Sequence, residues 1–160
     1  MAIASIPSIT FTRPANTTAY TAGDVVGSAT SAIHELTGAA SSSSFVFVQS
    51  VQLLINNTTV PAGMAGFRVH LYNASPTAIV DNAAYTFTTA DVAAWQDSFD
   101  LNTPVVRGSM LRSQAYYQGG ILKLLPASSS LFAEIETLGA YTPASGTAYT
   151  LRVKVLEAGF

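Results

Sequence analysis

Alternation of apolar and polar side chains is the dominant pattern along this chain. From Tyr149 to Val155 the odd positions are apolar, whereas the even positions carry Thr, Arg and Lys. A period of two is typical of a strand with one face in a core. Residues 67–72 (FRVHLY) and 131–136 (LFAEIE) alternate in the same way. The pattern therefore predicts a protein built from strands.

Residues 130–157 are predicted to form a β-hairpin. Two alternating arms flank a segment rich in Gly, Pro and Ser, which is the composition of turns. In this interpretation the outward Glu134 and Glu136 of the first arm face the outward Arg152 and Lys154 of the second. Opposite charges on paired strands give a modest cross-strand stabilisation.

Residues 45–55 (FVFVQSVQLLI) form the strongest predicted strand, and both of its faces are apolar. Strict alternation places on one face Phe45, Phe47, Val51, Leu53 and Ile55. On the opposite face it places Val46, Val48 and Leu54. A strand with two apolar faces is buried on both sides, or its outer face is an interface.

The candidate subunit interface consists of Val46, Val48, Leu54, Ile6 and Ile9. The last two come from residues 1–14, where two prolines restrain the preceding residues to extended geometry. This segment is expected to be the first strand, or an arm laid on a neighbouring subunit. Residues 15–160 are expected to form one β-sandwich domain.

Many short strands separated by turn signals predict an all-β, antiparallel β-sandwich of jelly-roll or Greek-key type. Gly119-Gly120 is the expected turn of a hairpin between residues 110–117 and 121–125. One short helix is expected to start at Thr88, with Asp91 in its first turn. A parallel α/β fold is excluded because long helical periods are missing.

The composition is poor in charge. Charged residues make up 10% of the 160 residues, against about 25% in a typical soluble domain. Hydrophobic residues reach 49%. This favours a surface covered by copies of the same chain or by a larger assembly. The alternative is a monomer with a neutral, hydroxyl-rich surface. There is no Cys, which excludes disulfides and thiolate metal sites.

Charge and hydropathy also limit the partners. The formal net charge is −2, and the seven basic residues are scattered singly, which disfavours nucleic acid. No apolar run approaches the roughly 18 residues of a membrane span, so no membrane partner is expected. The first residues lack the pattern of a secretory signal, and assembly in a cytoplasm is expected.

No constellation of reactive residues is visible, so we expect no enzyme, no catalytic residue, no cofactor and no metal site. His34 and His70 lack a second metal ligand at a helpful spacing. Glu134 and Glu136 are interpreted as strand neighbours rather than as a hydrolase pair. The remaining candidates are rings that stack on sugars or anchor protein interfaces if exposed: Tyr85, Trp95, Tyr116, Tyr117 and Tyr141.

Three stretches resemble a known group of proteins: ITFTRPANTTAYTAGDVVG (9–27), FRVHLYNASPTAIVDNAAYTF (67–87) and ETLGAYTPASGTAYTLRV (136–153). They are similar to small virion proteins of tailed bacteriophages, in particular head decoration (cement) proteins. The resemblance implies a non-enzymatic structural protein that binds the phage major capsid protein as a homotrimer. It implies a place on the capsid surface after assembly in the host cytoplasm, and it carries over no binding residue.

A second function stays open beside the first. A carbohydrate-binding β-sandwich module, or the receptor-binding tip of a phage fibre, would use exposed aromatic rings. A stable trimer without glycan binding favours the first function, and a monomer with sugar affinity favours the second.

Overall fold

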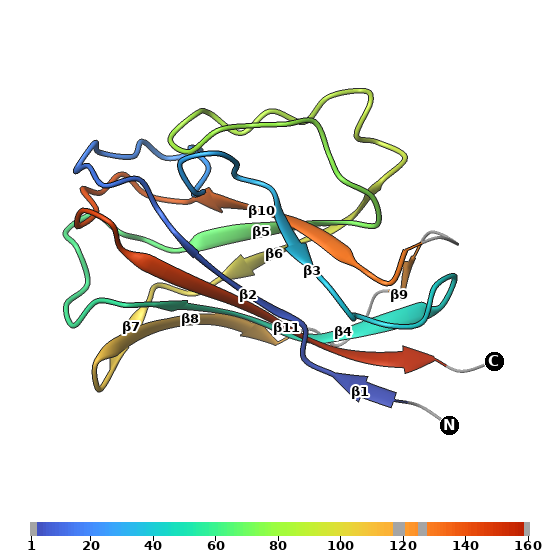
Figure 1. The fold of residues 1–160 in the computed structure, drawn as a ribbon. Coiled ribbons are helices and arrows are strands. Elements are labelled where there is room, and N and C mark those ends of the chain that lie inside the picture. Colours follow the sequence, from blue (N-terminus) through green and yellow to red (C-terminus); the bar gives the residue numbers. More distant parts are fainter. Residues whose placement is uncertain (1–2, 117–120, 125–127, 159–160) are drawn as a thin grey trace.

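The computed structural model describes residues 3–116, 121–124 and 128–158, and they fold into two antiparallel β-sheets packed face to face (Figure 1). The predicted all-β, antiparallel β-sandwich is confirmed at this level. The jelly-roll or Greek-key assignment stays a prediction. The described ranges contain no helix, and thus no helix that could cross a membrane.

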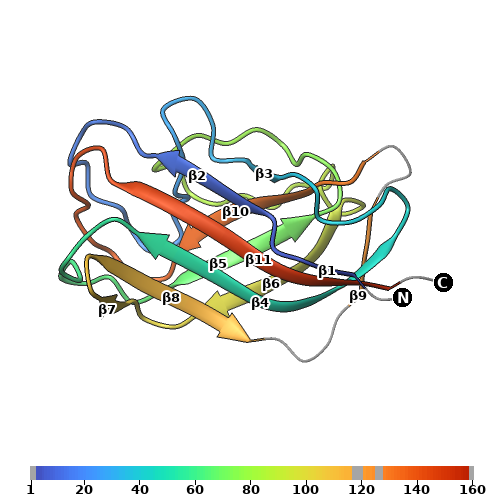
Figure 2. The same ribbon diagram turned by 60° about the horizontal axis from the view of Figure 1, so that its bottom comes forward.

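The larger sheet has seven strands: β1 (Ile3–Ser5), β2 (Ser8–Thr12), β4 (Phe45–Ile55), β7 (Val105–Arg107), β8 (Met110–Tyr116), β9 (Ile121–Lys123) and β11 (Ala148–Ala158). Its order is β1-β11-β4-β8-β7, with β2 also paired to β11 and β9 also paired to β4. The smaller sheet has four strands: β3 (His34–Leu36), β5 (Phe67–Tyr72), β6 (Trp95–Leu101) and β10 (Leu131–Thr137). Their order is β3-β10-β5-β6. Figure 2 brings the larger sheet to the front.

The core lies between the sheets and is built by the inward residues of the alternating strands. β4 and β11 pair from Tyr149↔Ile55 to Ala158↔Phe45 and form the centre of the larger sheet. Fully buried residues on the facing strands include Leu53, Val153, Val69, Leu71 and Ile135. Apolar alternation in the sequence therefore identifies the inner faces of β5, β10 and β11 correctly.

A β-bulge in β4 changes which residues face the core. Ser50 pairs with Lys154 and Val48 pairs with Val155, so Gln49 is an extra residue without a partner position. One extra residue reverses the alternation on its N-terminal side. Val46 (0% exposed) and Val48 (3%) consequently point into the core. The prediction that they lie on a second, outer apolar face is wrong.

The predicted hairpin of residues 130–157 is also wrong. β10 pairs with β3 and β5 in the smaller sheet, whereas β11 pairs with β1, β2 and β4 in the larger sheet. The turn-rich segment crosses from one sheet to the other. Glu134 and Glu136 therefore do not face Arg152 and Lys154. Alternation identifies the buried face of each strand, but it does not identify the strand beside it.

The expected short helix is replaced by a turn. Asp91 is buried, and its carboxylate accepts hydrogen bonds from the backbone N–H and hydroxyl groups of Thr77 and Thr88 at 2.6–3.2 Å. β6 already begins at Trp95. The capping pattern is thus present, but it fastens the long β5–β6 loop instead of starting a helix.

Gly119 and Gly120 lie outside the described residues, but the strands on either side of them do not pair as the predicted hairpin requires. β8 and β9 both pair antiparallel with β4, at residues 50–55 and 45–47 respectively. Two strands antiparallel to the same strand run in the same direction, so they cannot be the two arms of an antiparallel hairpin.

The N-terminal strands pair within the same chain. Ile3 lies opposite Glu157, and Ile9 lies opposite Leu151. Ile9 is half-buried and packs against the core, whereas Ile6, between β1 and β2, is 49% exposed.

Candidate functional site

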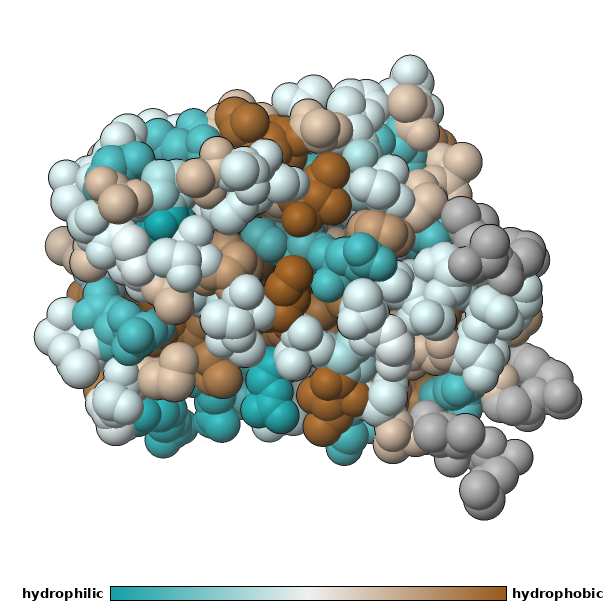
Figure 3. Space-filling model, viewed as in Figure 1, coloured by the Kyte–Doolittle hydropathy of each residue, from teal (hydrophilic) through white to brown (hydrophobic). Residues whose placement is uncertain are grey.

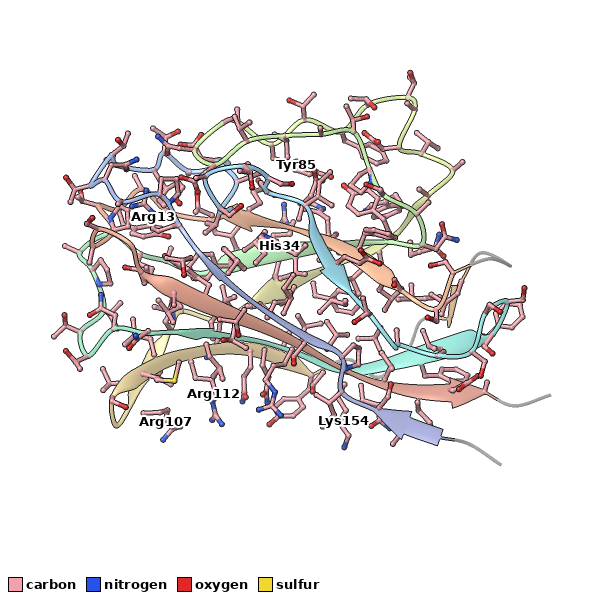
Figure 4. All side chains as sticks on the ribbon, in the orientation of Figure 1. Arg13, His34, Tyr85, Arg107, Arg112 and Lys154 are labelled. Atoms are coloured by element: carbon pink, nitrogen blue, oxygen red, sulfur yellow. The ribbon has the colours of Figure 1, made fainter. Side chains whose placement is uncertain are left out.

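The outer face of the smaller sheet carries a cluster of polar and aromatic side chains that contact one another. Outward positions of β5, β6 and β10 supply Arg68, His70, Tyr72, Ser98, Asp100, Glu134 and Glu136. The β5–β6 loop (73–94) passes over this face and adds Tyr85 (Figures 1 and 4). Under this loop Tyr72, His70 and Glu134 are buried, although the alternation places them outward, whereas Asp100 stays exposed.

Glu134 is held in this enclosed layer by tyrosine hydroxyls. The Tyr72 hydroxyl donates to Glu134 Oε2 at 2.7 Å, and the Tyr85 hydroxyl lies 2.9 Å from that of Tyr72. Burial raises the pKa of Glu134 to about 7, although the hydrogen bond from Tyr72 acts in the opposite direction. Near neutral pH this carboxyl group is therefore divided between its charged and neutral forms.

His70 lies between a ring and a carboxylate. Its ring stacks on Tyr85 with centroids 3.9 Å apart and 4° between the planes, and Nε2 is 2.9 Å from Glu136 Oε2. Burial lowers the pKa of His70 even though Glu136 favours its charged form. Arg68 donates from Nε and Nη2 to the two carboxylate oxygens of Asp100 at 2.6 and 2.9 Å. The acids and bases of this layer thus bind one another.

An open cavity of about 200 Å³ adjoins this layer, and we call it the aromatic pocket. Its lining residues are Arg68, His70, Tyr85, Phe87, Trp95 and Ser98. The rings of Phe87 and Trp95 meet edge to face at 5.8 Å, and both side chains remain partly exposed. Exposed apolar rings beside fixed hydrogen-bonding groups are suited to a ligand with an apolar face and polar edges.

A second cavity of about 380 Å³ shares Arg68 and Ser98 with the aromatic pocket and reaches Tyr116. Tyr116 is 74% exposed. Of the rings singled out from the sequence, Tyr85, Trp95 and Tyr116 lie at these cavities, whereas Tyr141 is buried in the core and Tyr117 lies outside the described residues. The contributions of Phe87, Arg68 and Ser98 were missed because the fold alone brings these residues together.

The two histidines have different surroundings. His34 is buried, stacks on Phe11 at 3.9 Å, and its Nε2 lies 2.9 Å from the Val26 carbonyl oxygen (Figure 4). Burial lowers the pKa of His34 to about 4. Within the described ranges, no three His, Asp or Glu side chains are grouped so that they could hold a metal ion.

The five candidate interface residues are separated by the fold. Val46 and Val48 belong to the core of their own sandwich, so they offer no surface to a neighbour. Leu54 is half-buried on the outer face of the larger sheet, opposite Thr150 and Arg112. Ile6 lies at the same face, beside Gln52 and Arg152. The interface expected at Ile6, Ile9 and Leu54 stays a prediction.

Comparisons with known proteins give little guidance. No family model matches the chain, and no curated protein matches it. Among solved structures, a chain in the three-dimensional structure of Cocksfoot mottle virus at 2.7 Å resolution is similar over 99% of this chain and 84% of that chain. The sequence identity is 10% and the TM-score is 0.35, and a likeness of this size carries no argument about function.

Proposed function

We propose that this chain is a non-enzymatic structural protein of a virion, and more specifically a head decoration protein of a tailed bacteriophage that binds the capsid lattice as a homotrimer. The resemblance of residues 9–27, 67–87 and 136–153 to such proteins supports this proposal, as does the low charge of the chain.

The structural observation that carries the proposal is the open outer face of the larger sheet. No other described element lies over this face (Figure 2). Exposed large apolar side chains on this face or beside it are Ile6, Phe47, Val105 and Tyr116. On the side seen in Figure 3, apolar residues are likewise interspersed with polar ones. An uncovered sheet face that mixes apolar and polar residues is suited to docking on another protein, and a specific interface commonly covers about 800 Å² per partner.

The test is binding to capsids. Empty heads are assembled from the major capsid protein encoded nearest to this gene, and the purified chain is added before sedimentation. We expect saturable co-sedimentation at a fixed ratio to the capsid protein. Glu substitution of both Phe47 and Val105 should abolish it, whereas Glu substitution of Val80, exposed on the β5–β6 loop, should not. A chain that stays in the supernatant at every concentration would overturn the proposal.

A second candidate function is carbohydrate binding, and the aromatic pocket favours it. Trp95 and Phe87 offer ring faces, while Arg68 and Ser98 offer hydrogen-bonding groups at the same cavity. Glycan-array screening followed by calorimetry tests this function. Loss of the binding signal in Trp95→Ala, but not in Val92→Ala, would support it, because Val92 is exposed nearby in the chain yet does not line the pocket. An array without a signal would exclude it.

A further inference from the structure

The acidic side chains of this protein are used internally. Each of the nine Asp and Glu residues accepts at least one hydrogen bond from the chain itself. Asp81, for example, binds the Tyr20 hydroxyl and the Gly27 N–H and lies 3.6 Å from Arg13. Each of these carboxylates is thus held in place by at least one donor of its own chain.

The basic side chains are distributed differently. Arg13 and Arg68 are engaged within the fold. Four others have no hydrogen bond or ion pair to any described part of the chain: Arg107, Arg112, Arg152 and Lys154. Figure 4 shows Arg107, Arg112 and Lys154 along the outer side of the larger sheet. The four cations form what we call the basic band.

Strand pairing places the basic band across three strands. Arg152 and Lys154 are two residues apart on β11, so they project about 7 Å from each other on one face. Arg112 on β8 lies two strands away, about 10 Å across the sheet, in the row of Leu54 and Val105. All nine Asp and Glu side chains lie in the described ranges, and none of them shares these outward rows. Tertiary structure therefore gathers cations that are scattered in the sequence.

A cavity of about 240 Å³ lies within this surface, and we call it the basic hollow. It is lined by Arg152, Lys154, Ser50, Gln52 and Ile6. A guanidinium, an ammonium, a hydroxyl and an amide group all donate hydrogen bonds, and bonds from cations to a carboxylate are stronger than neutral ones. The hollow thus offers four kinds of donor and no competing carboxylate.

We propose that the basic hollow binds an Asp or Glu carboxylate on an acidic segment of a partner protein, and that the basic band orients this partner on the sheet. This proposal rests on the structural role proposed above and names the chemistry of the docking surface. Charge complementarity favours an acidic segment of another protein as the occupant of the hollow over a second copy, because every Asp and Glu side chain of this chain already accepts a hydrogen bond within its own fold. Exposed Ile6, half-buried Leu54 and exposed Val105 lie among the cations, as is typical of protein interfaces rather than phosphate-binding surfaces.

Fluorescence anisotropy with a labelled Glu-Gly repeat peptide tests the hollow directly, at about 20 mM salt, where exposed charges are weakly screened. We expect the double variant Arg152→Gln/Lys154→Gln to bind the peptide at least about tenfold more weakly, because charge-assisted hydrogen bonds are lost. The control Thr59→Glu/Thr89→Glu changes the net charge by the same two units at exposed positions away from the hollow, and its affinity should stay within about twofold. Urea unfolding of both variants verifies that they are folded.

Three results would overturn the proposal. The first is equal peptide affinity of wild type and Arg152→Gln/Lys154→Gln. The second is tighter binding of a labelled oligothymidylate with the same loss in this variant, which would assign the hollow to nucleic-acid phosphates. The third is undiminished co-sedimentation of the variant with heads, which would leave the proposed function standing without this site. If the wild-type protein binds the peptide but does not co-sediment with heads, the proposed carboxylate site stands and the proposed capsid role is rejected.

Discussion

The carboxyl group of Glu134 is buried, although the alternation along β10 places this residue on the outer face of the smaller sheet. It lies on β10 beneath the loop that carries Tyr85, and its side chain bonds to Tyr72. Removal from water disfavours the charged form, which raises the pKa from its ordinary value of 4.5 to about 7. The folded state therefore binds more protons than the unfolded state between these two pH values, and the contribution of Glu134 to stability decreases as pH rises through them.

We expect Glu134→Gln to raise the free energy of unfolding at about pH 8 by roughly 1–3 kcal/mol, because the amide accepts the Tyr72 hydrogen bond without carrying a charge. At about pH 4 the difference from wild type should vanish, because the wild-type carboxyl group is then protonated in the folded state. Urea unfolding across this range measures both. A difference that is the same at both pH values would contradict the shifted pKa.

Val48 tests the bulge at the level of one side chain. Val48→Asp places a charge in the core and should lower the free energy of unfolding by more than about 3 kcal/mol. Phe47→Asp, at the neighbouring position, is the matched control. The side chain of Phe47 is 37% exposed, so this substitution should cost far less unfolding free energy. Thermal unfolding compares the two. Equal costs would mean that Val48 does not face the core.

The elements follow the alternation, but their pairing does not. Residues 67–72, 131–137 and 148–158 are strands, as their period predicts. The partner of each strand is set by contacts between distant residues, which a local pattern does not contain. The same limit applies to β4, where one extra residue changes the facing of Val46 and Val48. The apolar character of β4 is visible in the sequence, but its bulge depends on the register with which it pairs to β11.

The carboxylate of Asp91 fastens two parts of the β5–β6 loop to each other. Asp91→Ala leaves the N–H and hydroxyl groups of Thr77 and Thr88 without their acceptor, and we expect a loss of about 1–3 kcal/mol in unfolding free energy. Amide hydrogen exchange at Thr77 and Thr88 should become faster. Thr89→Ala, at an exposed position in the same loop, serves as the control. Unchanged exchange at both residues would contradict this role of Asp91.

At the scale of the whole molecule, the expected association of subunits now depends on a smaller set of residues. With Val46 and Val48 in the core, Ile6 is the candidate with the most exposed surface. We expect sedimentation velocity at micromolar concentration to show a homotrimer, and Ile6→Asp to shift it toward monomer without unfolding the chain. Val80→Asp, on the opposite loop, should leave the trimer intact. A wild-type monomer under these conditions would contradict the expected oligomer.

The sequence alone determined that this protein is made of strands with one buried face, because the period of two is a local property that survives in any arrangement of the strands. The aromatic pocket was indicated only through Tyr85 and Trp95. The tertiary structure decided the pairing of β10 and β11, the inward turn of Val46 and Val48, and the gathering of Arg112, Arg152 and Lys154 on one face. These features depend on register and on contacts between residues far apart in the chain, which a local pattern does not specify.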